Sequence, residues 1–408
     1  MAAISALNKS SSTTTTWLLS CKSGKRSMLA VANKAKKAAF ALPRVLSVKQ
    51  PTWWSVKARP AVDVPVVLST PPTSSTPLRV GLASAIAFRQ AITYAVTQHR
   101  ATLELTPDGC GGVYMVQQRD DGRTLAIFKP RDEEYMAPQN PRGYRCPAAI
   151  VGETPHPAKM GFRVGDGAMR EVAAYVLDAM YDHFSGVPTT HFASLPVPNG
   201  GVKEGSIQAF VTSESSAEDV GSLRFGVADV HKIAILDIRL FNTDRHAGNI
   251  LLQPSKTSTY AMVPIDHGLC LPSIHHLDAA CFEWLHWAQA KFPLSADALA
   301  HIAALDDVQD AVALRSLGMN EDAIATMRVC TRVLKQGVSS GFSLFDVGSV
   351  LQRDGAGLTP SKLELMVSAV LAKEANVSSD RFWKLMDVAI ENLWEEADKC
   401  KGRSMSGL

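Results

Sequence analysis

The fold prediction starts from one polar stretch, Asn242-Thr243-Asp244-Arg245-His246-Ala247-Gly248-Asn249, and from a second one downstream, Pro264-Ile265-Asp266-His267-Gly268. Asp244 and Asn249 are five positions apart, and Asp266 follows 22 positions after Asp244. The apolar residues between the two stretches predict a pair of strands around a turn. A hairpin of this length can return Asp266 to the point where Asp244 and Asn249 lie. The sequence therefore predicts one site that gathers two carboxylates and an amide.

Two carboxylates and an amide in one site favour the chemistry of phosphoryl transfer. This reaction needs positioned groups, neutralised charge and one or two divalent ions, and Mg²⁺ prefers carboxylate and phosphate oxygens. We predict that Asp244 is the catalytic carboxylate beside the acceptor hydroxyl, and that Asn249 and Asp266 hold the metal. Arg245 and His246 are predicted to join the catalytic set, as positive or titratable groups beside the transferred phosphoryl group. The alternative, an exposed polar turn, explains one isolated motif but not two ordered stretches around an apolar hairpin.

Upstream residues supply candidates for binding a nucleotide. Lys129 ends an apolar run and resembles the lysine that pairs with phosphates in kinases. Glu171 opens the next well-formed helical pattern and is predicted to hold Lys129 in place. In the loop before the first predicted strand, Gly111 and Gly112 would let backbone N–H groups approach a phosphate. A simple turn explains these glycines almost as well.

The periodicity of apolar residues predicts strands followed by helices. A β-hairpin is expected at 112–118 and 123–129, then a helix at 169–184 and a strand at 207–211. The other predicted elements are helices at 82–100 and 228–241, strands at 250–253 and 261–265, and C-terminal helices near 296–305, 320–336, 343–352, 360–375 and 378–400. This order favours an α+β fold of two lobes with a cleft between them.

The first 80 residues differ from the rest of the chain in composition. They contain 12 Lys and Arg but a single acidic residue, Asp63, whereas the remainder carries a net charge of −8. This Ser/Thr-rich head is predicted to be disordered; a targeting segment and a basic surface for anionic lipid are alternatives. No apolar run is long enough to cross a bilayer, so any membrane association is expected to be peripheral. The seven scattered cysteines, without a CxxC pair, favour neither a zinc module nor a disulfide framework, and no nucleic-acid partner is expected.

Several blocks of this sequence resemble the phosphatidylinositol 3-/4-kinase superfamily, and within it the plant-type gamma group of type II phosphatidylinositol 4-kinases. They include Ala126-Ile127-Phe128-Lys129-Pro130, Arg170-Glu171-Val172-Ala173-Ala174-Tyr175, 230–252 and 264–272. The resemblance covers about residues 103–400. It implies a two-lobed, α+β protein-kinase-like fold. After the head at 1–80, a small mixed N-lobe is expected at 81–208 and a mainly helical C-lobe at 209–401.

The same resemblance implies an activity and its cofactors. The reaction would transfer the γ-phosphate of ATP to the 4-hydroxyl of phosphatidylinositol, with Mg²⁺ or alternatively Mn²⁺. Lys129 would bind the nucleotide phosphates. The segment 208–211 would form the hinge that meets adenine through its backbone, which adds Gln208, Phe210 and Val211 to the nucleotide site. The expected location is cytoplasmic and peripheral to a membrane, with a plastid or another organelle as the alternative.

The acceptor is the part of this prediction that stays open. After Asp266-His267-Gly268, the sequence contains His275 and His276 but no lysine or arginine before Lys291. A phosphoinositide headgroup favours basic partners. A Ser/Thr protein kinase with protein substrates is therefore the alternative, and a catalytically inactive scaffold is a third hypothesis.

Overall fold

The computed structural model describes residues 77–405, apart from 199, 256–258, 278, 355–356 and 358. The chain divides into two units, Met1–Pro65 and Val66–Leu408, and all described residues belong to the second. The predictions for the basic head therefore lie outside the described residues, except at its end. There the helix α2 (Pro77–Thr97) begins three residues before the predicted boundary at 80.

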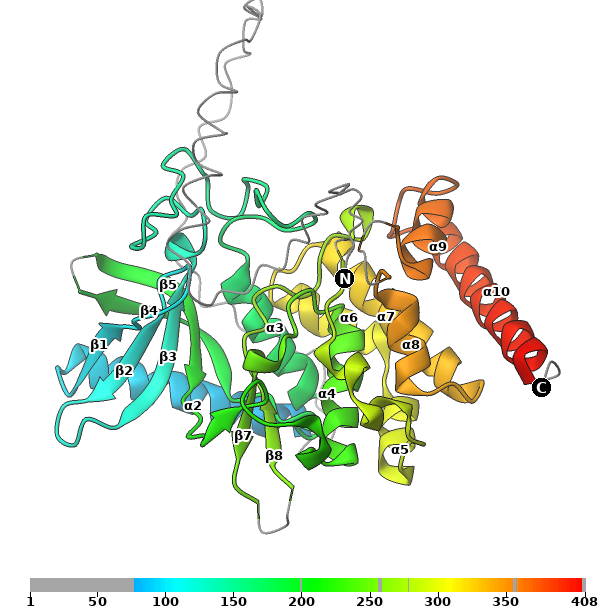
Figure 1. Cartoon of the computed structure of the whole chain (residues 1–408). Helices are drawn as coiled ribbons and strands as arrows, with labels where there is room; N and C mark the ends of the chain where they lie inside the picture. Colours follow the sequence, from blue (N-terminus) through cyan, green and yellow to red (C-terminus); the bar gives the residue numbers. More distant parts are fainter. Residues whose placement is uncertain are drawn as a thin grey trace, which may run out of the picture. The chain divides into compact units, whose positions relative to one another are not determined.

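A five-stranded antiparallel sheet forms the first lobe (Figure 1). Its strands follow the order β1-β2-β3-β5-β4. They are β1 (Ala101–Leu105), β2 (Tyr114–Gln118), β3 (Thr124–Pro130), β4 (Thr190–Val197) and β5 (Gly201–Ala209). The predicted hairpin is confirmed, since β2 pairs with β3, and Gly122 in its turn has φ +70°. Helix α2 packs against β4 and β1 of this sheet, and its Ile92 and Val96 belong to the same buried apolar cluster as Val116 and Phe128 of the inner strands.

The two edge strands of this sheet, β1 and β4, were not predicted from the sequence. β1 and β4 lie at the two ends of the sheet and each pairs with one neighbour only. β4 contains Pro196, which has no N–H to donate and is tolerated mainly on edge strands. β5 also begins earlier than the predicted strand at 207–211, because Gly201 to Ser206 pair with β4 although they are not uniformly apolar.

The helix α3 (Gly167–Ala179) follows a long irregular segment after β3. It lies between the sheet and the helical lobe and contacts β4, β5 and α6 (Figure 1). The predicted extension of this helix to 184 is wrong. Asp182 and His183 have φ of 56° and 54°, in the left-handed region, and the carboxylate of Asp178 accepts the N–H groups of Ser185 and Val187 instead.

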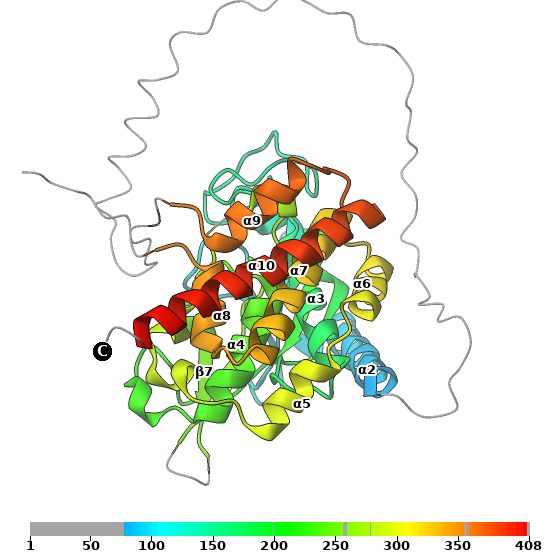
Figure 2. The ribbon, with the colours of Figure 1, turned by 90° about the vertical axis from the view of Figure 1, so that its right-hand side faces the viewer.

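The second lobe is built around the buried helix α4 (Val227–Leu240). A three-stranded sheet of β6 (Ser215–Ser216), β7 (Ile250–Gln253) and β8 (Ala261–Pro264) lies next to it. The remaining α-helices are α5 (Ala296–Ala304), α6 (Asp307–Ser316), α7 (Glu321–Ser339), α8 (Leu344–Leu351), α9 (Lys362–Leu371) and α10 (Asp380–Met405). Figure 2 shows α10 lying across α7, where Trp394 packs on Phe342 and its indole N–H donates to Val333 O.

The predicted α+β fold of two lobes is confirmed by this arrangement. All predicted C-terminal helices are present, but α6 was missed, because it has weak amphipathic character and begins with a run of acidic residues. Its start is defined instead by Asp306, whose carboxylate caps the N–H groups of Val308 and Gln309.

Candidate active site

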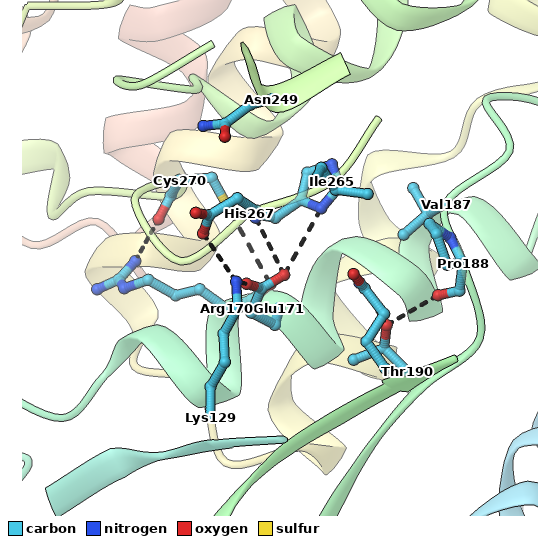
Figure 3. A network of polar contacts seen from close by, with 12 residues as sticks. Lys129, Arg170, Glu171, Val187, Pro188, Thr190, Asn249, Ile265, His267 and Cys270 are labelled. Carbon is cyan, nitrogen blue, oxygen red and sulfur yellow. Dashed lines mark hydrogen bonds and ion pairs between the residues drawn. The ribbon is translucent and has the colours of Figure 1, made fainter. Parts of the chain in front are cut away.

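Three charged side chains from separate elements meet where the sheet approaches the helical lobe. The Lys129 ammonium, at the end of β3, forms an ion pair with Glu171 of α3 and another, at 2.9 Å, with Asp266 after β8. Glu171 is 2% exposed, and it also accepts the backbone N–H of His267 at 3.0 Å. Figure 3 shows Lys129 rising from the sheet toward Glu171, with His267 beside it. The expected contact between Lys129 and Glu171 is therefore present.

The cluster is charged at neutral pH. Burial by itself lowers the pKa of Lys129, but the carboxylates of Asp266 and Glu171 raise it overall. Burial likewise raises the pKa of Glu171, yet Lys129 and His267 lower it overall. A charged lysine held by a helix glutamate is the arrangement with which kinases position a lysine for nucleotide phosphates, and this role of Lys129 stays a prediction.

Asp266 occupies a strained backbone position. Its φ is +56°, in the left-handed region that a residue with a side chain rarely adopts. Such strain is retained where the surrounding structure imposes it, commonly at functional sites. The side chain is 50% exposed, so the carboxylate of Asp266 is accessible to a cation while it contacts Lys129.

The loop after α4 places Asp244 and Asn249 close together. The carboxamide of Asn242 accepts the N–H of Asp244 at 2.9 Å, and Asn249 Nδ2 donates to Asp244 O at 3.0 Å. Because its nitrogen is engaged, Asn249 has its carboxamide oxygen left for a cation. The backbone N–H of Ile265 donates to Asn249 O at 3.0 Å, so the hairpin does return the residues around Asp266 to this loop.

Burial raises the pKa of Asp244, and the nearby carboxylate of Asp266 raises it further. Two carboxylates and an amide oxygen suit Mg²⁺, which takes few protein ligands and completes its shell with phosphate oxygens and water. Among the described residues, no group of three or more His, Cys, Asp or Glu side chains forms a metal site. The assignment of Asn249 and Asp266 as metal ligands, with Asp244 as the catalytic carboxylate, stays a prediction.

The structure corrects the predicted catalytic role of Arg245. Its side chain is fully buried and pairs with Asp237 through Nε at 3.0 Å. Its Nη1 donates to the carbonyl oxygens of Asn249 and Ile265, at 2.6 and 2.7 Å. Asp237 in turn accepts from Asn242 and Trp284. Arg245 therefore holds the catalytic loop and the segment before Asp266 together from the interior, and does not face a substrate.

His246 is exposed at the surface of the same loop. Its Nδ1 accepts the N–H of Gly248 at 3.1 Å and caps the short 3₁₀ turn Ala247–Asn249. This contact gives His246 a local structural role, and its proposed action as a titratable group stays a prediction.

The glycines of the loop before β2 pack against protein. The N–H of Gly112 donates to Glu133 O at 2.9 Å, and a Cβ at this position would lie 2.0 Å from Glu133 Oε2. Arg142 Nε donates to Gly111 O at 2.8 Å. The prediction that the N–H of Gly112 approaches a phosphate is wrong, because that N–H already has a partner. For Gly111 the prediction stays open.

The residues predicted to form the adenine-binding hinge fall into two groups. The backbone of Gln208 lies inside the sheet, paired in register with Ile127 on one side and Thr190 on the other. Its side chain donates to Thr190 Oγ1 at 2.9 Å. Gln208 is thus occupied by the sheet and is not free to bind adenine through its backbone. Phe210 and Val211 follow the end of β5. The N–H of Phe210 donates to Leu125 O at 3.1 Å, so the carbonyl of Phe210 and the backbone of Val211 stay candidates.

Two residues that position the site were not found from the sequence. The buried Arg170 of α3 donates to the carbonyl oxygens of Cys270 and Leu271, just beyond Asp266-His267-Gly268 (Figure 3). The carboxylate of Glu134 accepts the N–H groups of Gly165, Gly167 and Ala168 at the start of α3. Both contacts join residues more than 30 positions apart, so no local pattern in the sequence marks them.

A strand lysine paired with a helix glutamate, next to two loop carboxylates, is the arrangement of the kinase class of proteins. A family model described as "Phosphatidylinositol 3- and 4-kinase" matches residues 109–347. This match spans more than half of the chain, and the chain belongs to the phosphatidylinositol 3- and 4-kinase family. Membership of this family implies ATP and a divalent metal as cofactors, and the resemblance seen in the sequence is confirmed.

Related proteins carry the same family name. "Phosphatidylinositol 4-kinase gamma 4" of Oryza sativa subsp. japonica is 42% identical over 260 residues, which are 61% of this chain and 45% of the relative. "Phosphatidylinositol 4-kinase gamma 2" of Arabidopsis thaliana is 37% identical over 316 residues, 72% of this chain and 56% of the relative. The chain spans about half the length of these relatives.

Two solved structures of kinases overlap with this structure at low identity. One is the Rio2 kinase–ADP/Mg²⁺–phosphoaspartate complex from Chaetomium thermophilum, with 13% identity, a TM-score of 0.27 and coverage of 78% of this chain and 76% of that chain. The other is the MAP kinase LmaMPK10 from Leishmania major, with 11% identity, a TM-score of 0.23 and coverage of 77% and 90%.

Proposed function

We propose that this protein transfers the γ-phosphate of ATP to the 4-hydroxyl of phosphatidylinositol. The observation that carries the proposal is the charged cluster of Lys129, Glu171 and Asp266, next to Asp244 and Asn249. Family membership and the names of the relatives support a lipid as the acceptor. The predicted boundary between the two lobes, between residues 208 and 209, is part of the proposal. It lies next to Ala209, the last residue of β5, so the hinge would follow this strand.

The geometry suggests a role for each group. Lys129 binds the nucleotide phosphates, and Glu171 holds its ammonium in place. Asn249 and Asp266 hold Mg²⁺, or alternatively Mn²⁺, which supplies positive charge at the phosphates. Asp244 orients the acceptor hydroxyl and accepts its proton during transfer. The proton acceptance needs the carboxylate form of Asp244, and the raised pKa makes this carboxylate a stronger base than an exposed aspartate.

The partner surface is proposed to be a membrane that contains phosphatidylinositol. Within the described residues, no helix is both long and apolar enough to cross a membrane. We therefore propose peripheral association on the cytoplasmic side. A plastid or other organelle, reached through the basic head, stays the alternative.

Purified protein incubated with phosphatidylinositol vesicles, radiolabelled ATP and Mg²⁺ tests the proposal. We expect labelled lipid in the organic extract, and none with the Asp244→Asn variant. Labelled protein without labelled lipid would refute the lipid assignment and favour a Ser/Thr protein kinase. Absence of any transfer, while ATP still binds, would favour an inactive scaffold.

A further inference from the structure

A hairpin inserted between β3 and α3 reaches the candidate active site. Within it, Pro155 and Arg163 form an antiparallel bridge, and the N–H of His156 donates to Phe162 O at 2.9 Å. We call residues 154–164 the inserted hairpin, because the N–H of Val164 also donates to Thr154 O and closes its base. Its tip, 157–161, carries Lys159.

The inserted hairpin docks on the segment that follows Asp266-His267-Gly268. The N–H of Ser273 donates to Gly161 O at 2.9 Å. A Cβ at Gly161 would lie 2.3 Å from His276 O, and the φ of +77° already favours glycine. Only a glycine permits this approach, so the hairpin has a defined position over residues 273–276.

This docking brings a base to the catalytic loop. Lys159 Nζ donates to Thr243 O at 3.1 Å, immediately before Asp244. The ammonium has three protons, and this is the single hydrogen bond recorded for it among the residues that the structure describes. Two protons are therefore left to bind a ligand.

Lys159 and Lys129 approach the site from different elements. Lys129 reaches in from the sheet and contacts Glu171 and Asp266, whereas Lys159 arrives with a hairpin docked on residues 273–276. The segment 269–290, which follows Asp266-His267-Gly268, contains no lysine or arginine. Lys159 supplies a positive charge to this segment from more than 100 positions earlier in the chain.

We infer that Lys159 binds the phosphodiester of the acceptor headgroup and so orients the inositol ring, with its hydroxyl at Asp244. This inference rests on the proposed function. An ammonium on a flexible stem acts on phosphate as a point charge. A headgroup with an anionic phosphodiester is then preferred over a neutral hydroxyl acceptor, such as a serine in a protein.

The test measures transfer to soluble dioctanoyl phosphatidylinositol, so that membrane binding does not enter. For Lys159→Met we expect the KM for this acceptor to rise about ten- to a hundredfold, the loss of one charge-assisted hydrogen bond. The kcat, the KM for ATP and the slow ATP hydrolysis without acceptor are expected to stay within about twofold. Lys159→Arg, which keeps the charge, is expected to recover most of the affinity.

Two further variants separate binding from structure. Arg163→Met removes an exposed base of the same hairpin, whose Nη1 bonds Gly152 O, and is expected to leave the KM for the acceptor unchanged. Gly161→Ala displaces the docked hairpin and is expected to raise this KM as Lys159→Met does. Glycerophosphoinositol should compete with the acceptor lipid less well in Lys159→Met than in the wild-type protein. Inorganic phosphate should compete poorly with the acceptor in both proteins.

Each result decides the inference. A Lys159→Met variant with the wild-type KM for the acceptor would overturn it while leaving the proposed function intact. A parallel fall of kcat and of ATP hydrolysis would also overturn it, because Lys159 would then act on the transferred phosphoryl group. Inorganic phosphate competing as well as glycerophosphoinositol would overturn the headgroup assignment. Absence of transfer by the wild-type protein would overturn the proposed function itself.

Discussion

Replacing Arg245 by methionine is expected to lower the free energy of unfolding by about 4 kcal/mol. Arg245 and Asp237 are both 0% exposed, and removal of one partner from a buried ion pair costs about 3–5 kcal/mol, because the other charge is left buried. The carbonyl oxygens of Asn249 and Ile265 also lose their donor, at about 1 kcal/mol each. Asn242 and Trp284 still donate to the Asp237 carboxylate, at about 1 kcal/mol each, which offsets the two lost carbonyl bonds and leaves a loss of about 4 kcal/mol.

Urea unfolding followed by tryptophan fluorescence measures this loss. The double variant Asp237→Asn/Arg245→Met buries no charge, and we expect it to recover about 2 kcal/mol relative to Arg245→Met. His246→Gln, on the exposed face of the same loop, serves as the control and should change stability by less than about 0.5 kcal/mol. An Arg245→Met protein with wild-type stability but no phosphoryl transfer would refute the structural role and restore a direct catalytic one.

Three further predictions concern the nucleotide, the catalytic carboxylate and pH. Lys129→Met is expected to weaken ATP binding about ten- to a hundredfold, measured by titration with a fluorescent ATP analogue, and unchanged affinity would contradict the phosphate-binding role. Asp244→Asn is expected to lower kcat about 10²- to 10⁴-fold at nearly constant ATP affinity, and an equal loss of affinity would argue against its role at the acceptor. Burial alone raises the pKa of Glu364, but hydrogen bonds from Arg353 and Ser361 lower it overall. The contribution of ionised Glu364 to the stability of the folded protein is therefore present above the unfolded pKa of about 4.3 and is lost as the pH falls through the folded pKa. Glu364→Gln should therefore cost about 1–2 kcal/mol in urea unfolding at pH 7, and this deficit should shrink as the pH falls below about 4.3. A deficit that does not change with pH would count against this ion pair.

The sequence by itself was sufficient for the elements whose patterns are local. The hairpin of β2 and β3 follows from alternating apolar residues around a turn with a glycine, and the strand pair β7 and β8 follows in the same way. Chain order and spacing were enough to predict that the chain returns to Asn249 just before Asp266, because the two strands of a hairpin lie side by side. The hydrogen bond from Ile265 N–H to Asn249 O is the contact that closes this return. Lys129 was found because it stands near the end of a regular strand, and Glu171 because it lies in the first turns of the next regular helix.

The edge strands and the end of α3 were beyond these patterns. β4 is held by its pairing with β5, and that pairing tolerates Pro196 at an edge. The end of α3 is set by the carboxylate of Asp178, which captures two backbone N–H groups beyond the helix. In both cases hydrogen bonds outside the local repeat decide where the element starts or stops.

Tertiary structure alone decided what the side chains at the site do. Arg245 lies in the sequence beside Asp244, the proposed catalytic carboxylate, yet its partner Asp237 is in the buried helix α4, and the ion pair turns the guanidinium inward. Gly112 looks like part of a phosphate loop, but Glu133 occupies the space and the N–H. Lys159 carries no motif and reaches Thr243 because Gly161 allows the inserted hairpin to dock. The sequence determined which residues are available for chemistry, whereas packing between distant segments determined which of them face the site, because a side chain's direction depends on partners that local spacing does not specify.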